Sequence, residues 1–332
     1  MEGAVTIGAV ERTLANRALD AGWRPITPVR RTDHRVAVIG AGPAGLSCAE
    51  RLNRSGVEVT VHDRSNKIGG LLQTGVPSFK LDKSLLDRRQ AILGQAGIHF
   101  VLNTLVDKAM LSALLENNDA IFLGLGAQKA RTIELPGQTL PGVEQALGWL
   151  EKNNTGERES LEGQQVLVLG GGDTAMDCAR SALRLGAEVT IAYRDPVGCL
   201  RASPKEITLT REEGGRFVLE HSPTRCEGTK QVAGVCFDTP SGKQVIDANL
   251  VLLALGQQAT PPPWLTDFDI ATESHGNIRV DTQGRTTHPK IWAGGDNTLG
   301  PNLAVNAMAA GRKAAEGMLA SFSVLKHFRR RA

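Results

Sequence analysis

Two apolar runs of strand length, each followed by a glycine-rich turn and a helical pattern, divide the chain into similar halves. Residues 36–39 form the first run and residues 166–169 the second. Continuous rather than alternating hydrophobicity is typical of strands that are covered on both faces of a parallel sheet. The pattern therefore predicts two βαβ units whose first strands begin 130 residues apart.

The spacing of apolar residues extends each unit to a helix and a second strand. In the first unit residues 43–55 have helical spacing, and residues 57–62 form the next strand. In the second unit the helix covers residues 173–185 and the strand residues 189–193. This alternation of strands and helices indicates an α/β fold with parallel sheets.

Two further elements are predicted after the second unit. Residues 250–255 form a short apolar run, which indicates another buried strand. Residues 303–321 have the pattern of a closing helix, and Asn302 is of a residue type that caps helix N-termini.

The first residues stand apart from both units. A helix is predicted over residues 6–21, with Gly22 as its stop. Pro25 and Pro28 disfavour helix in the connection that follows. The apolar positions that recur at helical spacing are Ile7, Val10, Leu14 and Ala18.

Composition adds limits to this picture. A chain of 332 residues suggests two domains, and 41% hydrophobic with 22% charged residues fits a soluble globular protein. The 37 glycines imply many tight turns. A net charge of +3 is too small to predict nucleic-acid binding. No apolar run reaches the roughly 18 residues of a membrane span, and the first residues lack a signal-peptide layout.

The cysteines do not form a metal-binding or redox motif. No two have CxxC spacing, and none is spaced as a zinc or iron–sulfur ligand, so we predict no metal site. An odd, scattered set suits a reducing compartment, which makes the cytoplasm the expected location. Each is expected to be a small buried hydrophobic side chain. The five are Cys48, Cys178, Cys199, Cys226 and Cys236.

The first glycine-rich turn has the full context of a dinucleotide-binding fingerprint. Gly40, Gly42 and Gly45 have GxGxxG spacing between a strand and a helix. They would form the tight turn, admit a pyrophosphate, and let the helix pack closely on the strand, respectively. The helix N-terminus would offer N–H groups to the anion. Asp63, 23 residues after Gly40, lies where an acid binds a ribose, although a solvated loop acid is the alternative.

Features downstream favour a cofactor that extends beyond the pyrophosphate. The pair Gly69–Gly70, with Leu71 and Leu72, would permit a close approach. Asp296 follows a short strand and two glycines, where an acid can bind a ribityl hydroxyl. The helix from Leu303 could then direct its N-terminus at a flavin and stabilise negative charge on it.

The second glycine-rich turn has the GxGxxA form and indicates a nicotinamide nucleotide. It spans Gly170 to Ala175, again between a strand and a helix. Arg194 occupies the position of the acid of an NAD site, and a guanidinium can bind a 2′-phosphate in a bidentate manner, which favours NADPH. Asp195 would repel that phosphate, so NADH stays possible. Arg201 and Lys205 are candidates for further positive charge, or for solvated surface charge.

Several segments resemble the NADPH-dependent small subunit of bacterial glutamate synthase. The resemblance covers nearly the whole chain. Residues 200–206 look nearer to dihydropyrimidine dehydrogenase, whose flavin-nucleotide part is related. The matching segments are residues 3–8, 22–25, 69–83, 168–178, 289–296 and 309–315.

This resemblance implies a fold and a domain order. The fold would consist of two Rossmann-like domains arranged as in glutathione reductase, with the NADPH-binding domain inserted in a discontinuous FAD-binding domain. Residues 1–31 would form a linker helix. Residues 32–128 and 250–332 would bind FAD, and residues 129–249 would bind NADPH.

The resemblance also implies cofactor-binding residues by position. No side chain is expected to act as a catalytic acid or base, because hydride transfer needs positioning rather than proton transfer. The FAD site would contain Gly40, Gly42, Pro43, Ala44, Gly45, Asp63, Gly70, Leu71, Leu72, Val106, Gly126, Gly295, Asp296, Leu303, Ala304, Val305 and Asn306, and the NADPH site Gly172, Asp173, Thr174 and Arg194. Arg201 is added to the NADPH site because of its positive charge.

By the same resemblance, a hydride would pass from NADPH to FAD and electrons would continue to an iron–sulfur cluster. The cysteine-rich domain that usually precedes this region in the family is absent from the sequence, so the acceptor would be another protein or domain. Asp195 replaces a second arginine, and Asn306 replaces a threonine. The sequence does not indicate an oligomeric state.

Two other interpretations stay open. A disulfide reductase resembling thioredoxin reductase would need a cysteine pair, and no close pair exists. A flavin-binding electron-transfer module would dock a partner without turnover of its own. Residues 1–31 and the basic segment 326–331 are candidate docking elements for such a partner.

Overall fold

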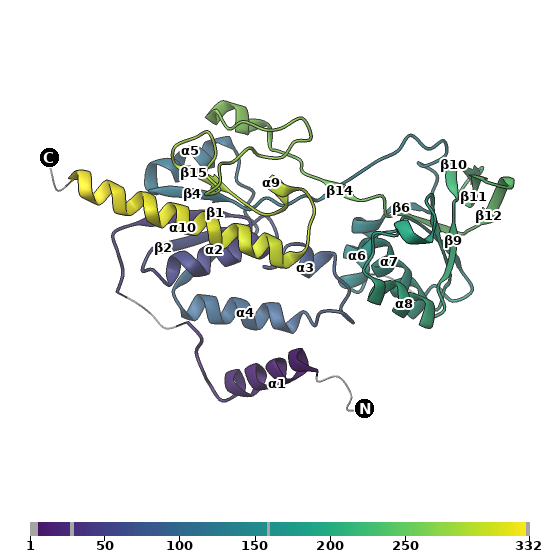
Figure 1. Cartoon of the computed structure of the whole chain (residues 1–332), viewed down its shortest axis with the longest axis horizontal. Coiled ribbons are helices and arrows are strands. Elements are labelled where there is room, and N and C mark those ends of the chain that lie inside the picture. Colours follow the sequence, from purple (N-terminus) through teal and green to yellow (C-terminus); the bar gives the residue numbers. More distant parts are fainter. Residues whose placement is uncertain (1–5, 27–29, 158–159, 330–332) are drawn as a thin grey trace.

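The computed structural model describes residues 6–26, 30–157 and 160–329, which form two lobes and a separate N-terminal helix (Figure 1). The first lobe is built on a five-stranded sheet with the order β15-β4-β1-β2-β3, in which all neighbouring strands are parallel. Its strands are β1 (Arg35–Ile39), β2 (Glu58–His62), β3 (Ile98–Val101), β4 (Ala120–Leu123) and β15 (Ile291–Ala293).

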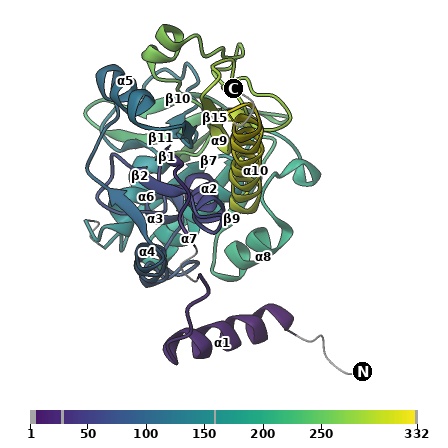
Figure 2. The ribbon, with the colours of Figure 1, turned by 90° about the vertical axis from the view of Figure 1, so that its left-hand side faces the viewer.

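Alternate residues of β1 enter two different cores. Val36 and Val38 pack with α2 (Pro43–Asn53) and α10 (Ala304–Arg329), whereas Ala37 and Ile39 pack towards α5 (Lys108–Asn117). Figure 2 shows α10 lying along α2 on one face of this sheet. Burial on both faces is the reason that the strand reads as a continuous apolar run.

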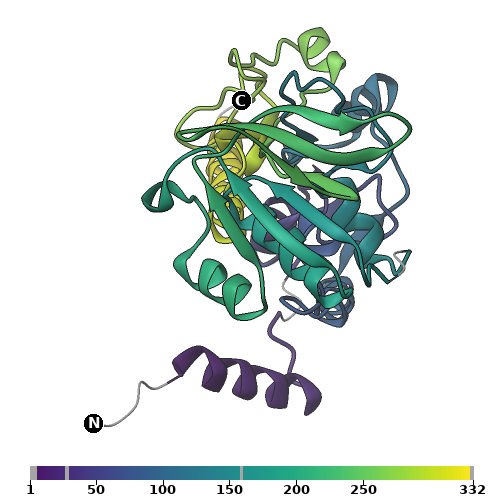
Figure 3. The ribbon, with the colours of Figure 1, turned by 90° about the vertical axis from the view of Figure 1, so that its right-hand side faces the viewer.

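The second lobe repeats this design. Its parallel sheet has the order β6-β13-β7-β8-β9, and three helices cover one face. A three-stranded antiparallel sheet covers the other face, seen at the outer end of the molecule in Figure 3. The elements are β6 (Val143–Gln145), α6 (Ala146–Asn154), β7 (Gln165–Leu169), α7 (Asp173–Arg184), β8 (Glu188–Tyr193), α8 (Pro204–Glu212), β9 (Arg216–Leu219), β10 (Ser222–Gly228), β11 (Val232–Thr239), β12 (Gly242–Asp247) and β13 (Leu250–Leu253).

The structure confirms the expected fold class, two Rossmann-like sheets with one lobe inserted in the other. One strand, however, belongs to the other sheet from the one predicted. The boundary predicted at residue 250 places β13 with the FAD-binding part. Instead, Leu250–Leu253 lies between β6 and β7 in the second sheet. A short apolar run is equally suited to either buried sheet, so its composition does not select one.

A narrow ribbon joins the lobes. The chain leaves the first lobe through β5 (Lys129–Ala130) and returns through β14 (Gln257–Gln258), and these two strands pair antiparallel. The chain then re-enters the first sheet at β15, which makes the first lobe discontinuous. We therefore propose that the inserted unit runs between β5 and β14 rather than ending at residue 249.

The N-terminal helix agrees with its prediction. This helix, α1 (Ile7–Asp20), stops at Gly22, which has a φ of 84°. The N–H groups of Gly22 and Trp23 donate to the carbonyls of Leu19 and Ala18, which is a Schellman cap. None of the α1 residues is buried. Pro28, residues 3–5 of the resemblance and residues 330–331 of the basic segment lie outside the described residues.

The closing helix differs from its prediction at both ends. It begins at Ala304, one residue later than expected, and ends at Arg329, eight residues beyond the expected end. The side-chain oxygen of Asn302 accepts bonds from the N–H of Leu303 and the amide of Asn306, both at 2.8 Å. Asn302 thus holds the backbone of Leu303, just before the helix, and the side chain of Asn306 in its first turn. Within the described chain, no helix combines the length and the apolar character of a membrane-spanning segment.

Candidate cofactor-binding site

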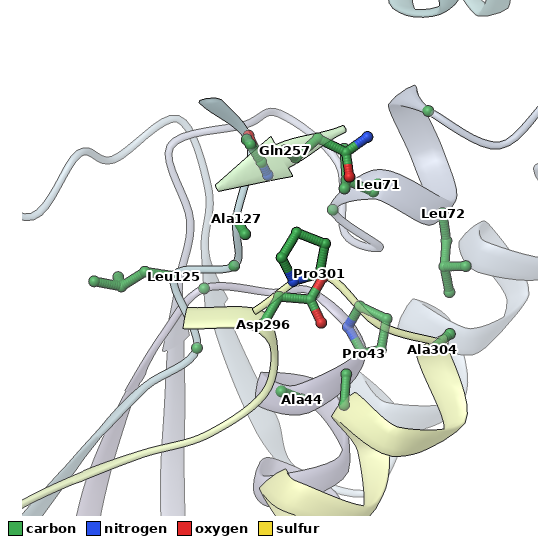
Figure 4. Close-up of a pocket in the computed structure, with 18 of the residues that line it drawn as sticks. Pro43, Ala44, Leu71, Leu72, Leu125, Ala127, Gln257, Asp296, Pro301 and Ala304 are labelled. Carbon is green, nitrogen blue, oxygen red and sulfur yellow. The ribbon is translucent and has the colours of Figure 1, made fainter. Parts of the chain in front are cut away.

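A cavity of about 580 Å³ lies where the two lobes meet. Its wall includes the first residues of α2 and α7, the ribbon strand β14, and the segment that leads into α10. Figure 4 shows Pro43 and Ala44 below, Leu71 and Leu72 on α3 (Leu71–Thr74), and Asp296 near the centre. Residues that are distant in sequence therefore share one wall.

The first glycine turn has the geometry that its spacing predicts. Gly40 has a φ of 105°, and a Cβ there would lie 2.2 Å from the carbonyl oxygen of Gly124. A Cβ on Gly45 would lie 1.8 Å from the Gly40 oxygen, so this glycine lets α2 pack on β1. A Cβ on Gly42 would have no atom within 4 Å, and this residue faces the cavity. That open position can admit a phosphate.

Asp63 fixes this turn as well as lining the cavity. Its carboxylate accepts bonds from the backbone N–H of Ala41 at 2.6 Å and of Ser65 at 2.7 Å. Each oxygen keeps a lone pair that could accept a ribose hydroxyl. The expected ribose ligand therefore also links the end of β2 to the glycine turn.

Gly70 packs directly on the first turn. It has a φ of 54°, and a Cβ there would lie 3.2 Å from the Cα of Gly42. The following residues, Leu71 and Leu72, line the cavity. Val106 and Gly126 also line it, so the residues expected at the adenine and at the flavin line the same cavity.

Asp296 is a half-buried acid on the cavity wall. Burial raises its pKa from 3.8 to about 6, and a bond from the backbone N–H of Asn302 acts in the opposite direction. Asn297, next in the chain, is fixed by a bond from its amide to the carbonyl of Leu123. Leu303 and Ala304 line the cavity, whereas Gly295, Val305 and Asn306 are not part of its wall.

The second glycine turn repeats the first. Gly170 has a φ of 146°, and a Cβ there would lie 2.3 Å from the oxygen of Ala254. A Cβ on Gly172 would have no atom within 4 Å. Asp173 and Thr174 line the cavity, and Gln257 of the ribbon donates to the Thr174 hydroxyl at 3.3 Å.

Both helices after these turns begin without a side-chain cap. Gly42 precedes α2 and Gly172 precedes α7, and neither helix N-terminus has a capping hydrogen bond from a side chain. The first N–H groups of such a helix lack intrahelical partners, and the helix dipole favours an anion there. The two turns therefore fit the phosphates of two nucleotides.

The basic residues expected at the NADPH site lie outside the cavity wall. Arg194 is exposed and lies 3.5 Å from the carboxylate of Asp195. The backbone N–H of Arg201 donates to the Gly171 oxygen at 2.9 Å, which holds this residue beside the second turn. Both flank Tyr193, whose ring lies against Gly171. The carboxylate of Asp195 therefore lies next to the guanidinium that is expected to meet a 2′-phosphate.

A charged cluster that the sequence interpretation missed bridges the lobes. Lys80 of the first lobe lies 2.7 Å from Asp177 on α7 and 3.3 Å from Glu206 on α8. Burial raises the pKa of Asp177 to about 6, and Lys80 opposes this shift. All three line the cavity. Asp177 follows the cavity residue Asp173 by one helical turn, so helical spacing was an available signal.

The same part of the first lobe makes further contacts with the second. Phe79 lies under the guanidinium groups of Arg180 and Arg184, at 4.8 and 4.2 Å from the ring centroid. The amide of Asn154 donates to the carbonyls of Thr74 and Val76. Within the first lobe, Lys83 holds this segment together by donating to the carbonyls of Leu72 and Val76, and burial lowers its pKa to about 8. Segment 74–83 is thus a junction between the lobes in addition to the ribbon.

The cysteines are mostly buried, as expected. Cys48, Cys178, Cys226 and Cys236 are buried thiols, whereas Cys199 is exposed. Burial raises the pKa of Cys48 and Cys178 well above the ordinary value for a thiol, which makes both poor nucleophiles. Among the described residues, no group of histidine, cysteine or acidic side chains is arranged to hold a metal ion.

Comparison with known proteins agrees with this geometry. Residues 34–311 match the model of the pyridine nucleotide-disulphide oxidoreductase family, and the chain belongs to this family. Within it, the relatives include glutamate synthase [NADPH] small chains. That of Escherichia coli is 40% identical over 96% of this chain and 75% of its own length, and that of Halomonas elongata is 41% identical over 96% and 74%.

A putative oxidoreductase of Escherichia coli, AegA, is also similar. It is 44% identical over 96% of this chain, which spans only 54% of that relative's length. Among solved structures, FprA of Mycobacterium tuberculosis in complex with NADPH has a TM-score of 0.76 at 17% identity, over 90% of this chain and 86% of that one. The thioredoxin reductase of T. acidophilum has a TM-score of 0.68 at 19% identity, over 88% of this chain and 100% of that one. These two likenesses concern the fold.

The family and its small-chain relatives confirm the predicted class. The chain is an NAD(P)H-dependent flavin oxidoreductase, and FAD and NADPH are its cofactors. The two uncapped helix N-termini and the open glycines fit such a pair of dinucleotides.

Proposed function

We propose that this chain accepts reducing equivalents from NADPH onto FAD and delivers electrons to a separate acceptor protein or domain, such as one that holds an iron–sulfur cluster. The observation that carries the proposal is the cavity that reaches from one dinucleotide turn to the other. When bound, FAD supplies the change from a two-electron donor to one-electron acceptors. The chain's contribution is to hold the reacting groups close together.

The assignment of residues to this task is also a proposal. The turn from Gly40 to Gly45 and the α2 N-terminus would hold the FAD pyrophosphate, with Asp63 at the ribose. Asp296 would accept a ribityl hydroxyl. The N-terminus of α10 would stabilise negative charge on the reduced cofactor. Gly172, Asp173 and Thr174 would hold the NADPH pyrophosphate, with Arg194 and Arg201 near its 2′-phosphate.

Val305 and Asn306 are proposed to contribute their backbone N–H groups to the FAD site. Neither side chain is part of the cavity wall, but both residues lie in the first turn of α10, whose N–H groups point along the helix axis towards its N-terminus. We further propose that the protein acts in the cytoplasm, in keeping with its free thiols.

An anaerobic titration tests the hydride step. The chain is loaded with FAD, and NADPH is added in portions while flavin absorbance is recorded. We expect the flavin absorbance to bleach with about one equivalent of NADPH, since each carries one hydride. Retention of oxidised flavin in the presence of excess NADPH and of excess NADH would contradict the proposal.

Turnover with a dye separates an enzyme from a passive flavin-binding module. We expect the FAD-loaded chain to reduce ferricyanide continuously with NADPH and without any partner protein. Thiol counting before and after NADPH addition addresses the disulfide-reductase alternative, for which new thiols should appear. With four buried cysteines and no disulfide among the described residues, we expect the count to stay constant.

A further inference from the structure

An apolar surface surrounds the segment that joins α9 (Asp296–Leu299) to α10. Leu299, Leu303, Val305 and Met308 are 61%, 60%, 63% and 43% exposed, and we call these four residues the apolar rim. Isolated exposed hydrophobic residues are ordinary, but four within ten residues form a local patch. Patches of this kind mark interaction sites in soluble proteins.

The apolar rim is continuous with the wall of the cavity. Leu303 lines the cavity and is also one of the exposed residues of the rim, and Pro301 and Ala304 next to it also line the cavity. In Figure 4, Pro301 and Ala304 lie beside Asp296 and Pro43. The apolar rim therefore adjoins the proposed flavin site. Since electron transfer weakens steeply with distance, an acceptor seated here would be well placed.

A shallow groove with a basic edge extends from the rim along α10. It has a volume of about 330 Å³ and is lined by Val305, Met308, Ala309, Arg312, Lys313 and Glu316. Glu316 lies 3.5 Å from Arg51 and is thereby neutralised. Arg312 and Lys313 are exposed and form no ion pair within the part of the chain that the structure describes. The groove therefore presents net positive charge beside apolar side chains.

We propose that the apolar rim and the Arg312–Lys313 edge are the docking surface for an acidic electron-accepting protein or domain. The apolar centre would supply contact area, and the two basic side chains would meet carboxylates at the edge of the partner. The opposite face of α10 is not available to a partner, because Ala307, Gly311 and Ala314 pack against the first lobe. This inference rests on the proposed electron delivery and names the surface and the chemistry of its acceptor.

The test uses the FAD-loaded chain with NADPH and three acceptors. A small acidic ferredoxin is the probe, basic cytochrome c is the opposite charge type, and ferricyanide needs no docking surface. At low ionic strength we expect ferredoxin to be reduced faster than cytochrome c. The double variant Arg312→Glu/Lys313→Glu should lower kcat/KM for ferredoxin about tenfold, and added salt should reduce that difference. Its ferricyanide rate should equal that of the wild type.

A matched control removes the effect of net charge. Lys230→Glu/Lys243→Glu makes the same charge change on the antiparallel sheet of the second lobe and its connecting turn, where both side chains are exposed. We expect this control to change kcat/KM for ferredoxin less than twofold, because distant exposed charges are largely screened. Met308→Ser should raise KM for ferredoxin while the ferricyanide rate stays constant.

Specific outcomes would overturn the docking proposal. One is equal loss in the two charge-reversal variants. Another is absent ferredoxin reduction or faster cytochrome c reduction by a wild-type chain whose flavin is bleached by NADPH. A third is a change in sedimentation of the Arg312→Glu/Lys313→Glu variant without a change in ferredoxin kinetics, which would assign the surface to self-association. Failure of NADPH to bleach the flavin would instead refute the proposed function itself.

Discussion

Asp296 is proposed to bind the cofactor, but the partial burial of its carboxylate lowers the stability of the fold. Unfolded, its carboxyl would titrate near pH 4, whereas burial raises its pKa to about 6 in the fold. Between these values the folded chain holds a proton that the unfolded chain has released. The free energy of unfolding therefore falls as pH rises through this window and stays low above it.

Replacing this acid tests both roles. We expect Asp296→Asn to be more stable than wild type at pH 7 and close to wild type at pH 4 when both chains lack flavin, as measured by urea denaturation. FAD affinity should fall about tenfold, because a charged acceptor is lost. Parallel stability curves for the two chains across this pH range would contradict the burial argument.

Substitutions of Arg194 and Asp195 test the proposed preference for NADPH over NADH. Arg194→Gln should raise KM for NADPH about tenfold, which corresponds to the loss of one charge-assisted interaction with the 2′-phosphate. KM for NADH should stay nearly constant. Asp195→Asn is the matched control and should lower KM for NADPH, because it removes a repelling carboxylate 3.5 Å from the guanidinium. Steady-state rates with ferricyanide give both constants.

Among the elements, the close packing of α2 against α10 depends on a glycine at their contact. A Cβ on Gly311 would lie 2.0 Å from the carbonyl oxygen of Ala44, in the first turn of α2. This carbonyl belongs to a backbone that cannot move without disturbing the first glycine turn. The closeness of the two helices is thus tied to the shape of the proposed pyrophosphate site.

Gly311→Ala should therefore separate α10 from α2. We expect a loss of about 1–3 kcal/mol in the free energy of unfolding, as for overpacking in other cores, together with weaker FAD retention. Gly148→Ala on α6 is the control, since a Cβ there would have no atom within 4 Å. It should be neutral or stabilising by up to about 1 kcal/mol. Urea denaturation of both variants decides between these outcomes.

In the whole molecule, the two lobes are joined by the ribbon and by the contacts of segment 74–83. Lys80 pairs with both Asp177 and Glu206 at this junction, and Arg180 also pairs with Glu206, at 2.8 Å. Without Lys80, the pKa of Asp177 would rise further above 6, because burial would act unopposed. The free energy of unfolding of a chain without Lys80 would therefore fall more steeply as pH rises, up to the pH at which the folded acid ionises.

Lys80→Met is expected to destabilise the chain more at pH 8 than at pH 5. Loss of one partner from a largely buried pair typically costs about 3–5 kcal/mol when the remaining group stays charged. The double variant Lys80→Met/Asp177→Asn should recover most of the loss at pH 8, because the uncompensated carboxylate is gone. Thermal denaturation at the two pH values measures this, and a loss that is equal at both would refute the electrostatic explanation.

Local elements were predictable because their signals are local. The positive φ at Gly40 and Gly170 favours glycine at these two positions. A helix without a side-chain cap begins directly after each turn, at Gly42 and Gly172. The glycines therefore recur at a fixed spacing that can be recognised in the sequence. Gly22 likewise ends α1 where its conformational freedom predicts. The elements that escaped prediction include β10 to β12, whose strands alternate little in polarity although they pair locally as consecutive antiparallel hairpins.

The sequence by itself determined the two βαβ units, their glycine turns and the kind of cofactor that each suits, because these depend on backbone conformations within a few residues. Only the tertiary structure decided which sheet contains β13, that Lys80 meets Asp177, and that the rim around Leu303 lies at the wall of the cavity. These depend on how the ribbon of β5 and β14 places one lobe against the other, and contacts across 97 residues of chain leave no periodic signal in composition or spacing.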